Sequence, residues 1–197
     1  MKLLVIGRPG AGKGTQARRV ARVLGVPHIS TGDLLRDAIS EGTPLGLRTN
    51  DCVSAGRLVP DSLVGEMLET RLGRADARLR GWLLDGFPRT ADQLEGLVRW
   101  LAPDRLDAAV ELVVPAEVAV ARLLARGRAD DTASAIRQRL DAYERETRPV
   151  LRLLDDEGLL VSIDADRPVD EVTAAVLDAI GAASGRADNG ALPRSNQ

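Results

Sequence analysis

Short apolar runs alternate with longer amphipathic stretches along most of this chain of 197 residues. Such runs, bounded by glycine, proline or charged residues, are typical of strands buried on both faces of a sheet. Apolar residues at helical spacing fill the stretches between them. The predicted strands are Leu3–Ile6, Pro27–Ile29, Gly81–Asp85, Ala108–Val114 and Leu159–Ile163. The predicted helices include Gln16–Leu24, Ser62–Leu72, Ala91–Leu101, Ala116–Ala125, Thr132–Leu154 and Val169–Ile180.

Strands that alternate with helices predict an α/β fold, a doubly wound five-stranded parallel sheet with helices on both faces. In such a sheet, right-handed crossovers bring the ligand-binding loops to the carboxyl ends of the strands. The chain length suits one well-buried core with a small appendage. Residues 184–197 lack apolar periodicity, and we expect them to form a disordered tail.

Composition and charge exclude several classes of function. The net charge of −2 gives no electrostatic case for binding nucleic acid or a membrane surface. The single cysteine, Cys52, rules out an internal disulfide and argues against a cysteine-based zinc site. No apolar run approaches the roughly 20 residues that span a bilayer, and the first residues lack a secretory pattern. We therefore expect a cytoplasmic protein.

A glycine-rich stretch, "GRPGAGKGTQ", follows the first predicted strand. Glycines allow backbone N–H groups to crowd around a polyphosphate at the start of a helix. Gly7, Gly12 and Lys13 have the spacing of the common phosphate-binding loop, but Gly14 stands where a hydroxyl is usual and Thr15 follows one place later. Only Lys2 and Lys13 among 27 basic residues are lysine, and a compact ammonium suits a position between phosphates.

Two further motifs follow the second and third predicted strands. In "STGDLLR", Ser30 or Thr31 can cap the next helix, but capping leaves Arg36 unexplained. In "DGFPRT", an aspartate at the end of a buried strand beside a phosphate loop is the expected second anchor for Mg²⁺ or its waters, although a plain Asp-Gly turn is the alternative. Gln93 also fits the spacing of a capping box with Thr90, which offers it a purely structural role.

The helix after the fourth strand carries arginines into a short segment, "ARLLARGRADDT". Arg122 and Arg126 share one helix face. Gly127 indicates a short mobile segment. Asp130 and Asp131 either hold arginines through ion pairs or begin the next helix at its positive end.

Taken in order, these motifs resemble the adenylate kinases, a family of nucleoside monophosphate kinases, and the match covers residues 1 to about 180. "GRPGAGKGTQ", "ISTGDLLR", "GRLVPD", "LLDGFPRT" and "RGRADDT" all resemble family signatures. The family loop ordinarily reads G-x-P-G-x-G-K-G-T, so Gly14 is the family's own form. The resemblance implies a phosphate-binding-loop fold that transfers the γ-phosphoryl group of Mg·ATP to AMP, giving two ADP, with Mg²⁺ as cofactor.

The resemblance also implies roles for individual residues. Those on the ATP side are Gly10, Ala11, Gly12, Lys13, Gly14, Thr15, Arg122, Arg126 and Arg167. Those on the AMP side are Thr31, Arg36, Arg57, Leu58, Val59, Gly86, Phe87, Pro88, Arg89, Gln93, Arg128 and Arg139. The implied catalytic residues are Lys13, Arg89, Arg128 and Arg139. Asp33 and Asp85 would hold Mg²⁺ through water.

The same resemblance divides the chain into a core of residues 1–29, 60–125 and 133–183, an AMP-binding segment of residues 30–59 and a short lid of residues 126–132. Longer lids in the family can carry zinc, whereas the short lid and single cysteine predict no zinc site here. Nothing in the charge or the lid suggests more than a monomer. Arg8 stands where a small residue or proline is common, and no role follows for it from the sequence.

Other functions fit the motifs less well. A UMP/CMP kinase shares the loop and the arginines, but such relatives tend to carry a small residue and an asparagine in place of Thr31 and Gln93. A GTP-dependent switch needs an N-K-x-D run, which this chain lacks. A simple ATP-binding module leaves "STGDLLR" and "DGFPRT" without a purpose.

Overall fold

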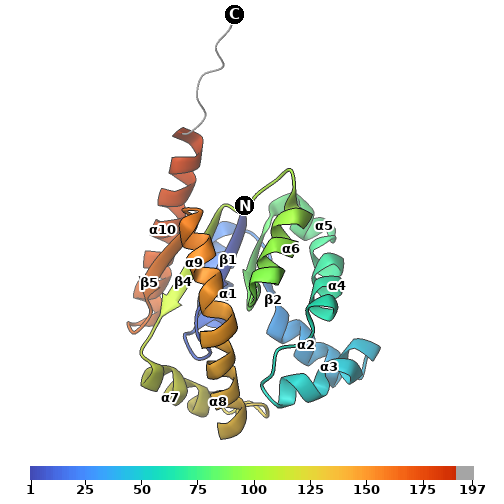
Figure 1. The fold of residues 1–197 in the computed structure, drawn as a ribbon. Helices are drawn as coiled ribbons and strands as arrows, with labels where there is room; N and C mark the ends of the chain where they lie inside the picture. Colours follow the sequence, from blue (N-terminus) through green and yellow to red (C-terminus); the bar gives the residue numbers. More distant parts are fainter. Residues whose placement is uncertain (190–197) are drawn as a thin grey trace, which may run out of the picture.

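A computed structural model describes the backbone of residues 1–189 and the side chains of residues 1–183 (Figure 1). The five strands form one parallel sheet in the order β2-β3-β1-β4-β5. Each predicted strand is confirmed, with ends displaced by at most one residue. The strands are β1 (Lys2–Ile6), β2 (His28–Ser30), β3 (Trp82–Asp85), β4 (Ala108–Val113) and β5 (Leu160–Asp164).

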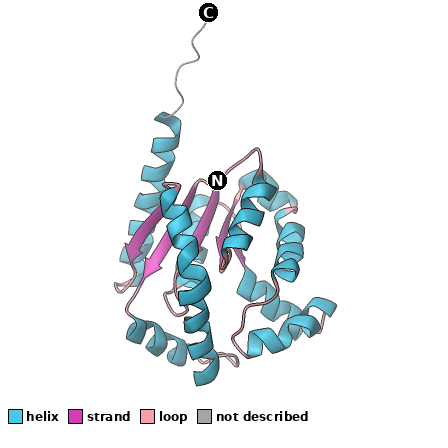
Figure 2. Cartoon of the chain, viewed as in Figure 1, coloured by secondary structure: helices cyan, strands magenta, loops and turns pink. Residues whose placement is uncertain are grey.

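Helices cover both faces of the sheet, so the predicted α/β fold is confirmed (Figure 2). Alternate residues of β1 enter two separate cores, because successive side chains of a strand point to opposite faces. Leu4 and Ile6 pack in the core beneath α4 (Asp61–Leu72), α6 (Ala91–Leu101) and α9 (Arg148–Asp156). Leu3 and Val5 pack in the core beneath α1 (Lys13–Leu24) and α10 (Val169–Asn189).

The predicted helix over Thr132–Leu154 is wrong in its detail. The chain instead forms α8 (Ala133–Ala142), a π-helical turn η1 (Tyr143–Thr147) and then α9. Pro149 has no N–H group, so it cannot donate the regular helical hydrogen bond to the Arg145 carbonyl. The chain accommodates the proline with the wider π-helical turn η1, which lies just before Pro149. Wide turns of this kind are frequent at functional sites.

Two helices were not predicted, α3 (Pro44–Ser54) and α5 (Ala75–Arg80). Helix α3 pairs with α2 (Thr31–Ser40), away from the sheet (Figure 1). A Cβ atom at Gly46 would lie 2.0 Å from the Ala38 carbonyl oxygen, so the two backbones touch directly. The capping hydrogen bond from Gly46 N–H to Thr43 Oγ1 at 3.1 Å is the local signal that starts α3.

At the C-terminus, α10 continues to Asn189 and so takes in residues 184–189, where we expected the tail to begin. The rest of that expected tail, residues 190–197, lies outside the described residues. Within the described part of the chain, no helix combines the length and apolar character needed to cross a membrane.

Candidate active site

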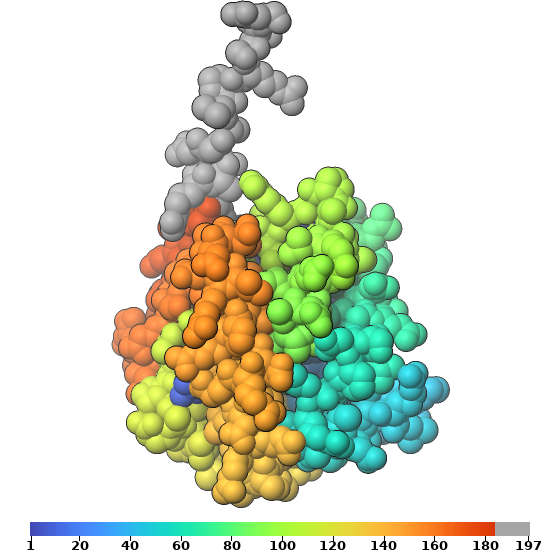
Figure 3. Space-filling view, viewed as in Figure 1, coloured from blue at the N-terminus to red at the C-terminus, as the bar shows by residue number. Residues whose placement is uncertain are grey.

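A cavity of about 620 Å³ opens at the carboxyl ends of β1 and β3. In the space-filling view, the segment from α7 (Ala116–Arg126) to α9, in yellow to orange, meets the blue-green α2–α4 segment, and little of the N-terminal segment remains visible (Figure 3). The cavity gathers almost every residue that the sequence nominated. The exceptions are Ala11, which is only 1% exposed in the core, and Arg167, which pairs outside the cavity with Glu171 at 2.8 Å.

The glycine loop between β1 and α1 is shaped by close backbone contacts. A Cβ atom at Gly10 would lie 2.2 Å from the Ala119 carbonyl oxygen, and one at Gly7 would lie 2.6 Å from the Leu112 carbonyl oxygen. Gly12 immediately precedes α1, with φ of 90° and no side chain to cap the helix. The N-terminus of α1, with its free N–H groups and positive dipole end, therefore faces the cavity. Helix N-termini of this kind bind phosphate groups.

Lys13 points its ammonium group back across this loop. Its Nζ donates to the carbonyl oxygens of Gly7 at 2.7 Å and Arg8 at 3.0 Å. Burial lowers the pKa of Lys13 from its ordinary 10.5 to about 8; Asp85 opposes this shift, while Arg89 and Arg126 add to it. Lys13 is thus a desolvated cation placed where phosphates would bind.

Gly14 has a steric reason to replace the usual hydroxyl residue. A Cβ atom there would lie 3.3 Å from Asp85 Oδ2, which is tighter than ordinary contact. Asp85 ends β3 and is only 7% exposed, and its carboxylate lines the cavity beside the loop. His28 Nε2 lies 3.5 Å from the same Oδ2.

Ser30, and not Thr31, caps the start of α2. Ser30 Oγ accepts the Asp33 N–H at 3.3 Å, so Ser30 is the cap. The Thr31 hydroxyl instead donates to the Gly86 carbonyl at 3.0 Å. Because a hydroxyl has one hydrogen, Thr31 presents only acceptor capacity to the rest of the cavity.

Arg89 and Gln93 are held by the turn after β3. Arg89 Nε donates to the Gly86 carbonyl at 2.8 Å, and the Arg89 N–H donates to Gln93 Oε1 at 2.7 Å. Thr90 caps α6 by accepting the Gln93 N–H at 3.2 Å, so half of the predicted capping box forms. The Gln93 amide nitrogen donates to Asp61, a residue that the sequence did not single out, at 2.6 Å.

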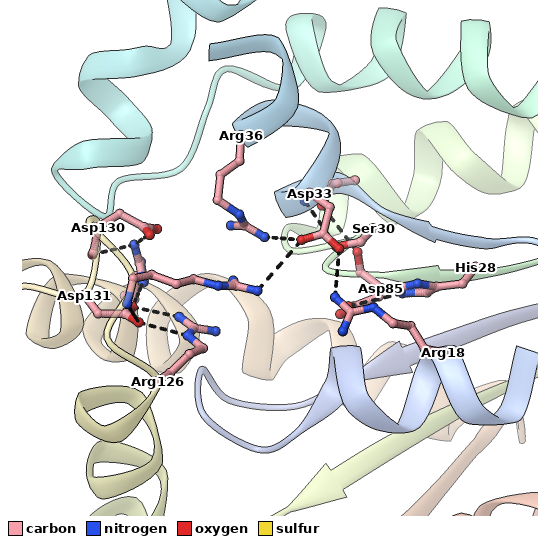
Figure 4. Close-up of polar contacts among 12 residues, drawn as sticks. Arg18, His28, Ser30, Asp33, Arg36, Asp85, Arg126, Asp130 and Asp131 are labelled. Atoms are coloured by element: carbon pink, nitrogen blue, oxygen red, sulfur yellow. Dashed lines mark hydrogen bonds and ion pairs between the residues drawn. The ribbon is translucent and has the colours of Figure 1, made fainter. Parts of the chain in front are cut away.

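Asp33 lies among three arginines that come from different parts of the chain (Figure 4). Arg18 of α1 lies 3.3 Å from Asp33 Oδ2. Arg36 of α2 hydrogen-bonds Oδ1, and Arg128 of the loop before α8 lies 3.9 Å from the same Oδ1. Burial alone would raise the pKa of Asp33, but the hydrogen bonds from Arg36 and Arg18 outweigh it and lower the pKa. Arg18 is a contributor that the motifs missed.

The residues between α7 and α8 form a second ion-pair cluster (Figure 4). Asp131, with a side chain only 1% exposed, accepts hydrogen bonds from Arg126 Nη2 at 2.7 Å and Arg139 Nη1 at 2.9 Å. Arg139 also donates to the Asp130 carbonyl at 2.8 Å. Thr132 caps α8, accepting the Ala135 N–H at 3.2 Å. The two aspartates therefore hold arginines rather than cap the helix.

Asp131 makes a measurable prediction for acid stability. Burial raises its pKa, but the bonds from Arg126 and Arg139 dominate and bring it to about 2. A carboxylate with a lowered folded pKa stabilises the fold above its unfolded pKa and loses this contribution as pH falls. We expect Asp131→Asn to lower the free energy of unfolding by about 2 kcal/mol at pH 7. This difference should shrink to about half by pH 3. Urea denaturation of both proteins at several pH values measures it; a difference independent of pH would contradict the ion-pair account.

Two other arginines anchor the cavity walls. The Arg8 guanidinium lies 5.9 Å from the centre of the Tyr143 ring and 3.3 Å from Glu144, which ties the glycine loop to η1. This contact supplies the structural role for Arg8 that the sequence lacked. Arg122 donates to the Ala165 carbonyl at 3.1 Å, which holds it against the chain segment after β5.

The cavity as a whole is built for polyanions. Lys13, Arg36, Arg89, Arg128 and Arg139 all line it. Burial and the neighbouring Arg139 and Arg36 lower the pKa of Arg89, although Asp85 opposes them. Cations that repel one another in this way are relieved when an anion binds between them. The arrangement therefore has cations for one phosphate chain on the glycine loop and further cations for a second one.

Comparison with known proteins agrees with this geometry. The model of the adenylate kinase family matches residues 5–159. An adenylate kinase from Corynebacterium aurimucosum is 47% identical over 92% of this chain and 99% of its own length. An adenylate kinase from Mycobacteroides abscessus is 48% identical over the same shares, and adenylate kinase 1 from Synechocystis sp. is 47% identical over 86% of this chain and 91% of its own length. The chain belongs to the adenylate kinase family.

Proposed function

We propose that this chain transfers the γ-phosphoryl group of Mg·ATP to AMP, reversibly, to give two ADP. The observation that carries the proposal is one cavity that is lined both by a glycine loop with Lys13 and by the arginines Arg36, Arg89 and Arg139. A nucleotide-hydrolysing switch would need the first set alone. Two phosphate-binding sets in one cavity favour transfer between two nucleotides.

The ATP phosphates would bind the loop from Gly10 to Thr15, with the Lys13 ammonium between them. Ala11 would contribute its backbone, since its side chain is buried. Arg126 would reach the phosphates from the lid, and Arg122 would stack on the base. Arg167 would contact the nucleotide through its main chain, and its side chain pairs with Glu171.

The AMP phosphate would lie between Arg36 and Arg89. Arg57, Leu58 and Val59 line the same side of the cavity, as does the Gly86–Arg89 turn. Thr31, an acceptor toward the cavity, would take a hydrogen bond from the amino group of adenine, a group that the six-position oxygen of guanine cannot replace. Gln93 would recognise the same edge of the base.

Mg²⁺ fits the carboxylate oxygens that line the cavity. Mg²⁺ usually binds one or two carboxylates, several waters and substrate phosphates. Asp85 and Asp33 supply the carboxylates, both in the cavity lining and both beside the glycine loop or its helix. We propose that they hold the ion through water. When bound, the ion would neutralise charge on the phosphates.

The transfer itself asks the protein for alignment and for neutralised charge. Lys13, Arg128 and Arg139 would surround the transferred group from the loop, the lid and α8. Holding both nucleotides in line can lower the barrier by about 7–11 kcal/mol. No histidine base is required, and the single histidine, His28, lies beside Asp85 instead.

We propose that the AMP-binding segment of residues 30–59 and the lid of residues 126–132 close over the nucleotides, and that the enzyme is a cytoplasmic monomer. Two contacts support closure. A Cβ atom at Gly56 would lie 2.5 Å from the Ala135 carbonyl oxygen, and Asp33 pairs with Arg128 across the cavity. Closure keeps water from the γ-phosphoryl group, which would otherwise be hydrolysed.

Simultaneous binding of two nucleotides tests the proposal. We expect calorimetric titration to find one site per chain for a non-hydrolysable Mg·ATP analogue. Protein saturated with that analogue should still bind one AMP, because separate cation sets hold the two phosphate chains. Competition between AMP and the analogue for a single site would overturn the proposal.

A further inference from the structure

Asp61 lies outside the cavity lining but contacts a residue inside it. It begins α4, directly after the proposed AMP-binding segment. Its Oδ1 accepts the Gln93 Nε2 hydrogen bond at 2.6 Å, and its Oδ2 accepts the Thr90 hydroxyl at 3.1 Å. Gln93 is 6% exposed and lines the cavity.

The two partners of the Gln93 amide fix which way round it lies. A carboxylate only accepts hydrogen bonds, so Asp61 requires the NH₂ end of the amide. The Arg89 N–H only donates, so it requires the oxygen end, and it reaches Oε1 at 2.7 Å. The two constraints agree. The bond to a charged carboxylate is the stronger of the two.

The fixed Gln93 amide leaves a defined pair of hydrogen-bonding groups for a base. An amide NH₂ has two hydrogens and its oxygen has two lone pairs, so one donor and one acceptor remain after Asp61 and Arg89 are served. Adenine offers the matching pair along its six-membered ring, an acceptor at N1 and a donor at the N6 amino group. Guanine offers the opposite pair, a donor at N1 and an acceptor at O6.

We propose that Asp61 is a positioning residue for base selection, which holds the Gln93 amide in the orientation that accepts AMP and disfavours GMP. This inference rests on the proposed function, in which Gln93 recognises the base of the acceptor nucleotide. Asp61 lies outside the cavity lining, so in this proposal it acts through the amide and not by contact with a nucleotide.

A purely structural role for Asp61 makes a different prediction. The start of α6 is capped by Thr90, whose hydroxyl oxygen accepts the Gln93 N–H at 3.2 Å. Only the hydrogen of that hydroxyl goes to Asp61, and without Asp61 a partly exposed hydroxyl can donate it to water and keep the cap. Loss of the acceptor should therefore change base selection more than it changes the fold. Loss of one negative charge near the site affects AMP and GMP equally, so it cancels in the ratio of their kcat/KM values.

Asp61→Leu and Asp61→Glu, with Asp92→Leu as the matched control, test the inference. Asp92 is an exposed acid in the first turn of α6, as Asp61 is in α4, and it lies outside the cavity lining. We expect Asp61→Leu to lower the AMP-to-GMP ratio of kcat/KM about tenfold, mainly through KM for AMP, with little change in KM for ATP. Asp61→Glu keeps an acceptor-only group and should retain most of the ratio, and Asp92→Leu should leave it unchanged.

Gln93→Leu, measured in parallel, separates the possible failures. An unchanged ratio in Asp61→Leu beside a reduced ratio in Gln93→Leu would overturn the role of Asp61 and leave the proposed function standing. A larger loss in Asp61→Glu than in Asp61→Leu would show that the size of residue 61 matters and not its acceptor chemistry, which also overturns the inference. An unchanged ratio in Gln93→Leu would remove the base-recognition step on which it rests.

Discussion

Replacement of Lys13 by methionine is expected to lower kcat/KM for the transfer by at least about 10²–10³-fold without unfolding the protein. This is the size of effect seen when one preorganised donor to a developing negative charge is removed. Lys13 lies on the glycine loop at the cavity, and its side chain is held by the Gly7 and Arg8 carbonyls. Methionine keeps the length of the side chain and removes only the charge and the hydrogen bonds.

Lys13→Met is also expected to change how the stability of the protein depends on pH. Because burial lowers the pKa of Lys13 from 10.5 to about 8, the unfolded chain binds more protons than the folded chain between these pH values. Wild-type stability therefore rises with pH across this window, by on the order of 3 kcal/mol, relative to a variant that lacks the group. Chemical denaturation of both proteins at pH 7 and pH 10 measures this difference.

Lys2→Met is the matched control, since it alters the other lysine of the chain. Lys2 pairs with the exposed Asp104 far from the cavity, and a surface pair of this kind contributes little. Its activity should equal that of the wild type. Near-normal kcat in Lys13→Met would remove Lys13 from the proposed phosphate clamp.

Arg89→Lys is expected to lower kcat/KM for AMP by about 10–10²-fold, the cost of losing a hydrogen bond to a charged group while the positive charge is kept. Arg89 uses Nε on the Gly86 carbonyl and keeps its terminal N–H groups for a phosphate. A lysine ammonium is a single point charge and cannot satisfy both partners. The loss should appear as a raised KM for AMP and a lowered kcat, with KM for ATP nearly unchanged.

Arg99→Lys, on the neighbouring helix α6, is the matched control for Arg89→Lys. Arg99 is 72% exposed and pairs only loosely with Glu95, at 3.5 Å. We expect wild-type kinetics from it. An Arg89→Lys enzyme that kept its KM for AMP would show that the AMP phosphate binds elsewhere.

The strands and the glycine loop were accessible from the sequence because local pattern determines them. Fully buried strands appear as continuous apolar runs, and a parallel sheet brings the ends of distant runs to one edge. For this reason Lys13 and Asp85, 72 positions apart in the chain, could be expected at one cavity, and both line it.

The remaining features depend on contacts between distant residues. Whether Asp131 caps a helix or pairs with Arg139 is decided only when α8 folds back beside the lid segment. Asp61 gains its importance from a partner on a different helix, Gln93, which no spacing rule connects to it. The turn at η1 could have been suspected from Pro149, but the contact of Arg8 with Tyr143 that uses this turn could not.

The central claim is tested most directly by ADP formation from Mg·ATP with AMP, CMP, UMP or GMP as acceptor, beside a control without acceptor. The account predicts rapid ADP formation that depends on AMP, with the other nucleotides far slower. A preference for UMP or CMP would keep the phosphate clamp and contradict the roles of Thr31 and Gln93. ADP formed equally without any acceptor would contradict transfer between two nucleotides.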